Sequence, residues 1–137
     1  MLSAAERAFL SRRRTGCLAT ADRAGKPHLV PVCFAVADDA LYTAIDEKPK
    51  TGSALKRLTN ILENPAVAFL ADHYEEDWSR LGWVRLDGTA ELLPGGIERD
   101  SAIRLLRSRY PQYASMQLST VMAIRIAHVR SWGELER

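Results

Sequence analysis

The fold of this chain is constrained most by a succession of short, strand-like apolar segments that are joined mainly by brief polar turns. Because most of these links are local, antiparallel pairing is favoured over the long crossovers of a parallel sheet. At 137 residues the chain is expected to form a single domain spanning residues 1–137, mainly β in an α+β arrangement, as a barrel or sandwich with peripheral helices. We expect six strands, at Gly16–Thr20, His28–Val36, Ala40–Ile45, Ala66–Asp72, Trp83–Leu93 and Thr120–Val129.

Local signals place the helices and the irregular points of the sheet. Ser3 and Glu6 form a capping box, which predicts a helix from about residue 4 to Arg13. Apolar residues at helical spacing predict another helix over Ile97–Arg109. Pro31 indicates an edge strand or a bulge, and Gly88 indicates a bulge or a close backbone approach.

A short basic helix carries the clearest candidate binding site. Gly52 and Ser53 open it, and Lys56 and Arg57 follow near its first turn. A helix N-terminus offers unpaired N–H groups and a partial positive charge, so two adjacent cations there would make a phosphate site. The alternative is an ordinary basic helix end exposed to solvent.

Composition excludes several classes of protein. Hydrophobic residues make up 47% of the chain and charged residues 26%, which is typical of a soluble globular protein. The net charge of +2 is too small to indicate nucleic-acid binding. No apolar run approaches the roughly 20 residues of a membrane span, and Glu6 and Arg7 interrupt any signal peptide. We therefore expect a cytoplasmic protein, with Cys17 and Cys33 as buried, reduced thiols.

The chain offers no protein-borne catalytic centre. His28, His73 and His128 are far apart and lack the spacing of metal ligands, so we expect no metal. The Gly-x-Ser-x-Gly turn of a hydrolase is absent from the sequence. These absences favour cofactor chemistry, in which hydride transfer belongs to the cofactor and the protein supplies binding and orientation.

Three motifs in a fixed order carry a family resemblance. Tyr42-Thr43 ends a strand, Lys56-Arg57 is a basic pair, and Asn64-Pro65 ends a helix before a hydrophobic strand. Their order resembles that of the pyridoxamine 5′-phosphate oxidase-like split-barrel superfamily, which binds flavins. The resemblance extends from Gly16 to Gly133 and implies a homodimeric, antiparallel split β-barrel.

The resemblance also implies which residues would hold a cofactor. Lys56 and Arg57 would contact a phosphate, Thr43 and Ser53 would add hydrogen bonds, and Asn60 lies one turn further along the helix. Lys50, in the preceding loop, could meet an anionic cofactor tail. The strand residues Val30, Pro31, Val32 and Cys33 would flank the ring, and Trp83 and Trp132 would wall the pocket from across the dimer. For Trp83, a role in the core or in the interface is the alternative.

Two departures from the oxidases bear on the choice of cofactor. Val30 stands where the resemblance to flavin mononucleotide (FMN) oxidases leads us to expect a phosphate-gripping arginine. The chain also ends Ser131-Trp132-Gly133-Glu134-Leu135-Glu136-Arg137, without the vitamin-binding Arg-Leu-x-Pro-like motif. Both departures are similar to the branch that uses the deazaflavin coenzyme F420, which carries a phosphodiester and an oligoglutamate tail.

The sequence therefore predicts an oxidoreductase that uses reduced F420 to transfer hydride to a small organic acceptor. FMN is the alternative cofactor, in an oxidoreductase of the same fold. A second alternative is a cofactor or small-ligand binder without enzymatic activity, because a split barrel does not guarantee turnover.

Overall fold

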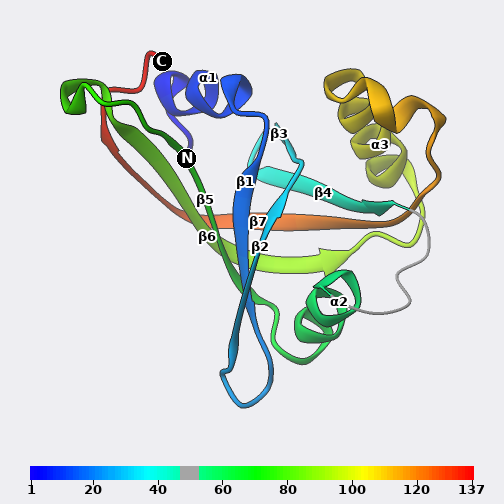
Figure 1. The fold of residues 1–137 in the computed structure, drawn as a ribbon. Coiled ribbons are helices and arrows are strands. Elements are labelled where there is room, and N and C mark those ends of the chain that lie inside the picture. Colours follow the sequence, from blue (N-terminus) through cyan, green and yellow to red (C-terminus); the bar gives the residue numbers. More distant parts are fainter. Residues whose placement is uncertain (47–52) are drawn as a thin grey trace.

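The computed structural model describes residues 1–46 and 53–137, without the side chains of residues 46, 53 and 54. Its centre is a seven-stranded antiparallel sheet in the order β2-β1-β5-β6-β7-β4-β3 (Figure 1). The mainly β, antiparallel prediction is confirmed, with three α-helices beside the sheet. The elements are α1 (Ala4–Arg12), β1 (Gly16–Ala21), β2 (Pro27–Val32), β3 (Ala35–Ala37), β4 (Ala40–Asp46), α2 (Ser53–Glu63), β5 (Ala66–His73), the 3₁₀ turn η1 (Trp78–Arg80), β6 (Gly82–Leu92), α3 (Ile97–Arg109), η2 (Pro111–Ser115) and β7 (Leu118–Gly133).

The prediction of six strands is wrong at one place, because the segment His28–Val36 forms two strands. β2 pairs with β1, whereas β3 pairs with β4 at the opposite end of the sheet. At Phe34, between them, the Tyr110 hydroxyl accepts a hydrogen bond from the backbone N–H at 3.0 Å and lies 3.0 Å from the carbonyl oxygen. The Thr43 hydroxyl donates to the Cys33 carbonyl at 2.8 Å. Side-chain hydroxyl groups therefore replace the hydrogen bonds between strands at the point where the chain stops pairing with β1 and begins to pair with β4.

The same crossing closes the sheet into a barrel. Only Cys33 and Phe34 separate β2 from β3, so the two edges of the sheet meet at this corner. β2 and β3 are not paired with each other in the described ladders, which leaves the barrel split there. Pro31 lies on β2, an edge strand of this sheet, as its missing N–H predicts.

Two hydrophobic clusters fill the molecule on opposite sides of the barrel wall. The first lies inside the barrel, where Phe9 and Leu10 of α1 and Ile61 of α2 join side chains such as Phe69 and Leu86 from the strands. The second packs α3 against the outer side of β3, β4 and β7. Figure 1 shows α1 and α2 at separate ends of the barrel, with α3 to one side.

Most local signals read from the sequence are confirmed. Ser3 and Glu6 form the capping box of α1, and α3 has its predicted bounds. The pairing of β6 with β7 shifts register between Asp87 and Gly88, which is the bulge that Gly88 indicates. A Cβ at Gly88 would lie 2.1 Å from the Arg125 carbonyl oxygen, so the close approach requires glycine.

A charged network attaches the start of α3 to the sheet. Arg125 of β7 binds both carboxylate oxygens of Glu98 and also binds Glu91 of β6. The Tyr42 hydroxyl donates to Glu98 at 2.7 Å. The hydrogen bonds from Arg125 and Tyr42 lower the pKa of Glu98 to about 2. Burial, followed by the bond to Glu98, raises the pKa of Tyr42 to about 12.

We expect Glu98→Gln to reduce stability in a pH-dependent way. A lowered folded-state pKa adds stability that is present above the ordinary value of 4.5 and is lost as the pH falls towards about 2. Because these side chains are partly exposed, the loss at neutral pH should be at most about 1 kcal/mol. Urea unfolding from about pH 7 to about pH 2 measures it, with exposed Glu76→Gln as the control. A difference from wild type that does not vary with pH would contradict this assignment.

Candidate functional site

The most unusual side chain in the described structure is a buried arginine on α2. Arg57 is 7% exposed, and its Nε has no hydrogen-bond partner among the described residues. Burial lowers the pKa of its guanidinium, and a favourable interaction with Tyr113 of η2 partly offsets this effect. A buried cation is costly unless it is paired, so this position is suited to an anionic ligand.

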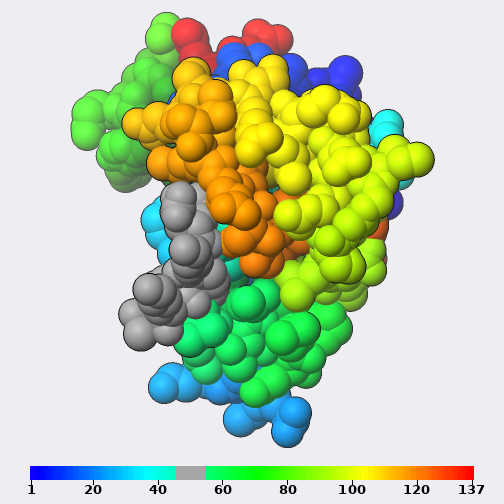
Figure 2. All heavy atoms as spheres, turned by 90° about the vertical axis from the view of Figure 1, so that its right-hand side faces the viewer, coloured from blue at the N-terminus to red at the C-terminus, as the bar shows by residue number. Residues whose placement is uncertain are grey.

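Helical geometry explains why Arg57 is turned inwards. Arg57, Asn60 and Ile61 are three and four residues apart, so they share one face of α2. Ile61 is 4% exposed inside the barrel cluster, and this face therefore points to the barrel. The alternative of a helix end exposed to solvent does not hold for Arg57. Figure 2 shows the segment from η2 to the start of β7 directly above α2.

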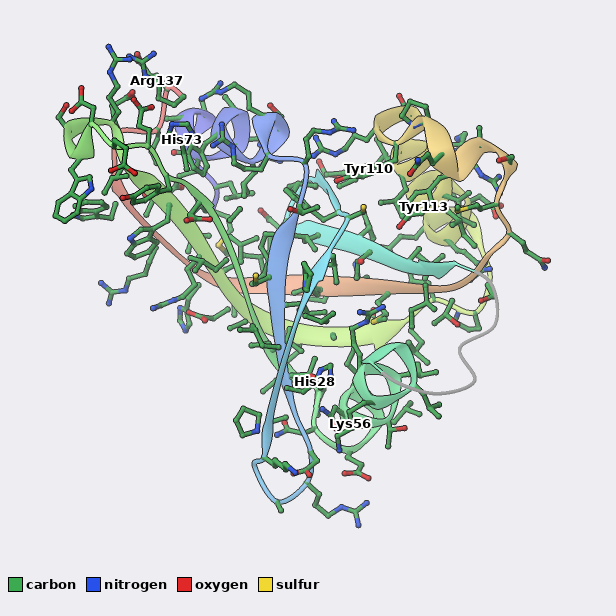
Figure 3. The ribbon with its side chains drawn as sticks, in the orientation of Figure 1. His28, Lys56, His73, Tyr110, Tyr113 and Arg137 are labelled. Atoms are coloured by element: carbon green, nitrogen blue, oxygen red, sulfur yellow. The ribbon has the colours of Figure 1, made fainter. Side chains whose placement is uncertain are left out.

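Lys56 has a different environment from its neighbour. Its side chain is 43% exposed, and its Nζ lies 3.7 Å from Asp22 Oδ2, just after β1. That pair attaches α2 to the β1–β2 turn, where Asp22 also accepts hydrogen bonds from the backbone of Ala24 and Lys26. Figure 3 shows Lys56 and His28 at the end of the molecule that α2 covers. Of the predicted basic pair, only Arg57 is a buried cation without a carboxylate partner in the described residues.

Two further polar groups near α2 are incompletely satisfied. Asn60 is fully buried, and its Nδ2 donates to the Thr20 hydroxyl at 3.0 Å, while its Oδ1 has no partner in the described structure. A hydroxyl can donate and accept, so Thr20 satisfies either end of the amide and the other end is left for a ligand. His28 lies opposite Thr20 in the β1–β2 ladder, and its Nδ1 is also buried and unpaired there.

The strand expected to flank the cofactor ring has two different faces. Val30 packs against the barrel core and Val32 is buried in it, whereas Pro31 is exposed on the outer side. Cys33 is half-buried, and its carbonyl oxygen is held by Thr43. Thr43 is fully buried. Because its hydroxyl proton is used in the hydrogen bond to Cys33, only its oxygen lone pairs remain to accept a hydrogen bond from a ligand.

Trp83 and Trp132 lie opposite each other on β6 and β7, away from α2 in the same subunit. α2 leads into β5 at Ala66, whereas Trp83 faces Asp72 near the other end of β5. Six residues of strand separate these points, or about 20 Å at about 3.3 Å per residue. The structure therefore does not bring the tryptophans and Arg57 together within one subunit.

Two other predicted site residues receive less structural information. Lys50 lies outside the described residues, and Ser53 is described only as the first residue of α2.

The three arginines at the end of α1 and just after it have structural roles. Arg12 donates to the Leu135 carbonyl at 2.5 Å, Arg13 donates to the Arg137 carbonyl, and Arg14 donates to the Arg109 carbonyl at 2.5 Å.

The sequence reasoning missed Thr20, His28 and Tyr113, which surround the inward face of α2. The pairing of Thr20 with His28 follows from the turn that joins β1 to β2, so it could have been predicted from the sequence. The position of Tyr113 could not, because no periodic pattern predicts the 3₁₀ turn η2 after α3.

Among the described residues, no group of histidine, cysteine or acidic side chains is arranged to hold a metal ion. No helix among these same residues is long and apolar enough to cross a membrane.

Comparison with known proteins gives one family. The family model described as pyridoxamine 5′-phosphate oxidase matches residues 2–133. No curated protein matches the chain at a significant level.

Solved structures of similar fold cover nearly the whole chain. A conserved hypothetical protein, Rv2991 from Mycobacterium tuberculosis, is 26% identical with a TM-score of 0.75, over 97% of this chain and 86% of that protein. An FAD-binding protein from Mesorhizobium loti is 28% identical with a TM-score of 0.70, over 95% and 94%. The heme storage protein HutZ from Vibrio cholerae is 17% identical with a TM-score of 0.75, over 99% of both chains, which shows the fold alone.

Proposed function

The chain belongs to the pyridoxamine 5′-phosphate oxidase family, and we propose that it is an oxidoreductase that uses reduced F420 to pass hydride to a small organic acceptor. The observation that carries the proposal is the buried guanidinium of Arg57, which has no carboxylate partner in the described residues. FMN, FAD and F420 all carry negative charge on phosphate, and F420 carries further negative charge on its oligoglutamate tail. Arg57 would hold this group, and Asn60 would supply a neighbouring polar contact.

The charge at α2 favours F420 over FMN. A phosphate monoester such as that of FMN carries about −1.5 to −2 at pH 7, whereas the phosphodiester of F420 carries a single negative charge. Arg57 is one uncompensated cation, because Lys56 is already balanced by Asp22. Position 30, where the resemblance to FMN oxidases leads us to expect an arginine, holds Val30 packed against the core. The one uncompensated positive charge among the described residues therefore matches the singly charged phosphodiester of F420 better than the more highly charged phosphate of FMN.

The protein's part in this reaction is to bind and orient. When bound, the cofactor supplies the hydride. The corner formed by Val32, Cys33 and Thr43 would support the ring, because its backbone is fixed by Tyr110 and Thr43. No described side chain near Arg57 has the arrangement of a nucleophile and base, so we assign no catalytic residue and expect solvent to supply the proton.

A flavoprotein is the second candidate function, and the Mesorhizobium loti FAD-binding protein supports it at 28% identity over nearly the whole of both chains. Equilibrium dialysis of F420, FMN and FAD against the purified protein at one salt concentration tests the choice. We expect F420 to bind most tightly. A preference of about tenfold or more for FMN or FAD, equal to about 1.4 kcal/mol, would contradict the deazaflavin proposal. Tight binding with no turnover by any acceptor would indicate a binding protein instead.

We also propose that the protein is a homodimer, because one face of the sheet is apolar and exposed. On the outer side of β2, β1 and β5 the side chains are apolar except for Asp72 near the end of β5, and two of the apolar ones, Leu29 and Leu70, are 67% and 41% exposed. Exposed apolar patches of this kind mark interaction surfaces. An isologous contact here would let Trp83 and Trp132 approach the cofactor held by the second subunit. The tryptophans of one subunit could then line the cofactor site of the other, although they lie far from Arg57 in their own subunit.

Replacing Leu29 with glutamate should therefore weaken the dimer. We expect light scattering to give about twice 15.3 kDa for wild type and a larger monomer fraction for Leu29→Glu, because a charge would be buried in the contact. The matched control is Leu62→Glu, since Leu62 is 69% exposed on α2, away from this face. Wild type that is monomeric at micromolar concentration would contradict the proposal.

The two cysteines are the basis for a proposal about the cellular compartment of the protein. Cys17 and Cys33 are free and half-buried. Unpaired thiols are typical of reducing compartments, so we propose a cytoplasmic location.

A further inference from the structure

A cavity of about 140 Å³ lies between α1, β3 and α3, and no described residue of α2 lines it. Figure 1 shows α1 and α3 on either side of β3, with α2 at the other end of the barrel. The apolar lining includes Leu10 of α1, Phe34 and Ala35 at the start of β3, and Leu105 of α3. An apolar cavity of about 150 Å³ can hold one benzene molecule, so this space suits an apolar group of about six carbons.

Both helices also bring polar side chains to the cavity. Arg7 and Ser11 lie four residues apart on α1, and Ser108 and Arg109 lie three and four residues beyond Leu105 on α3. Residues at this spacing share one face of a helix. The two facing helices therefore each contribute an arginine, a serine and a leucine to the same small space.

Arg109 has a structural role, but one of its donors is unused. Its Nη1 donates to the Ser11 carbonyl at 2.9 Å and its Nη2 donates to the Arg13 carbonyl, which satisfies backbone groups at the end of α1. The central carbon of its guanidinium lies 5.0 Å from the centre of the Phe34 ring. Its Nε is buried and has no hydrogen-bond partner in the described structure. A buried donor without a partner is unfavourable, and a bound carboxylate would satisfy it.

No acidic side chain balances the two arginines at the cavity. Arg7 Nη2 donates to the Asp38 backbone carbonyl at 3.1 Å. Neither Arg7 nor Arg109 forms an ion pair with a described residue. The nearby Asp38 and Asp39, in the turn after β3, are exposed, and none of the described residues that line the cavity is acidic. The positive charge of the cavity is therefore available to an anionic ligand.

We propose that this cavity binds a small monocarboxylate whose apolar body has about six carbons. The body would pack against Leu10, Phe34 and Leu105, and the carboxylate would accept charge-assisted hydrogen bonds from Arg109 and Arg7. The binding does not rest on the proposed oxidoreductase function, because neither α2 nor the cofactor is part of this site.

Fluorine NMR titration of the cofactor-free protein with 4-fluorobenzoate and with neutral 4-fluorobenzamide tests the charge. We expect wild type to prefer the benzoate by about tenfold, the lower end for a charge-assisted hydrogen bond. Arg7→Gln should remove most of this preference, and the glutamine amide can still donate to the Asp38 carbonyl. Arg109 is left in place because it also holds the end of α1. The matched control is Arg104→Gln, since Arg104 is exposed on α3 and does not line the cavity.

Two further measurements test the position of the ligand. Leu105→Trp should fill the cavity and weaken binding of both probes. Because overpacking can itself unfold a variant, backbone amide NMR of wild type provides an independent measurement. We expect 4-fluorobenzoate to shift the amide signals of Ala35 and Leu105 and to leave those of α2 unchanged.

Four results would overturn the inference. They are no binding of the benzoate by wild type at millimolar concentration, equal binding of the two probes by wild type, the same preference in Arg7→Gln as in wild type, and amide shifts confined to residues outside the cavity. Failure of the proposed function is distinguishable, because Arg57→Met should keep the preference for the benzoate whatever happens to cofactor binding.

Discussion

Replacing Arg57 with methionine should lower the affinity for F420 about 10- to 150-fold, which corresponds to loss of one charge-assisted hydrogen bond of about 1.5–3 kcal/mol. The same change should leave the cofactor-free protein as stable as wild type or more stable. Arg57 is buried and its Nε is unpaired in the described structure, so an apolar side chain of similar length removes a desolvated charge. Opposite effects on binding and on stability are typical of a residue retained for a ligand.

Fluorescence titration with F420 measures the affinity, and thermal unfolding without cofactor measures the stability. Lys56→Met is the matched control, because Lys56 is the adjacent cation but is exposed and paired with Asp22. We expect a smaller loss of affinity for this variant. If Arg57→Met binds F420 as tightly as wild type does, the phosphate lies elsewhere. If Arg57→Met is strongly destabilised, Arg57 has a structural partner and the assignment is wrong.

Replacing Tyr110 with phenylalanine should destabilise the protein by roughly 2–4 kcal/mol, because each buried polar group left unpaired costs about 1–3 kcal/mol. The Tyr110 hydroxyl accepts from the Phe34 N–H, lies close to the Phe34 carbonyl, and is 2.9 Å from the Arg14 carbonyl. No strand partner satisfies Phe34 in its place, since the chain is passing between β2 and β3 there. One hydroxyl therefore holds the corner at which the barrel closes.

Urea unfolding of wild type and of Tyr110→Phe measures this difference in the free energy of unfolding. It is calculated from the shift in the unfolding midpoint when the dependence of the free energy on urea concentration is unchanged. Tyr74→Phe is the control, since Tyr74 is 59% exposed and its hydroxyl bonds only to Trp78 at 3.3 Å among the contacts of the described residues. We expect that control to unfold close to wild type. A Tyr110→Phe protein within about 0.5 kcal/mol of wild type, the usual range for surface changes, would show that the corner does not depend on this hydroxyl.

The sequence predicted those parts of the fold whose signals are local. The capping box of Ser3 and Glu6, the bounds of α3, and the bulge at Gly88 each depend on contacts within a few residues or on one ladder. The division of the segment around Phe34 was not predictable in this way, because Tyr110 lies 76 positions along the chain from it. An apolar run that crosses between sheet edges has the same periodicity as a continuous strand.

The candidate site shows the same division. The resemblance selected Arg57 and Asn60, and helical spacing places them on one face of α2. Whether that face is exposed or buried depends on packing against β1 and on Tyr113 of η2, which distant parts of the sequence supply. Arg57 and Lys56 are adjacent in sequence and equal in charge, yet only the structure distinguishes a buried cation from a surface pair.

The most direct test of the proposed phosphate site compares cofactors with and without their phosphate. F420 is paired with the same deazaflavin lacking the phosphodiester and tail, and FMN is paired with riboflavin, each titrated into wild type and Arg57→Met. We predict that wild type prefers the phosphorylated member of a pair by about tenfold or more, and that Arg57→Met loses most of this preference. The same preference in wild type and Arg57→Met would contradict the account, because the phosphate would then be bound by residues other than Arg57.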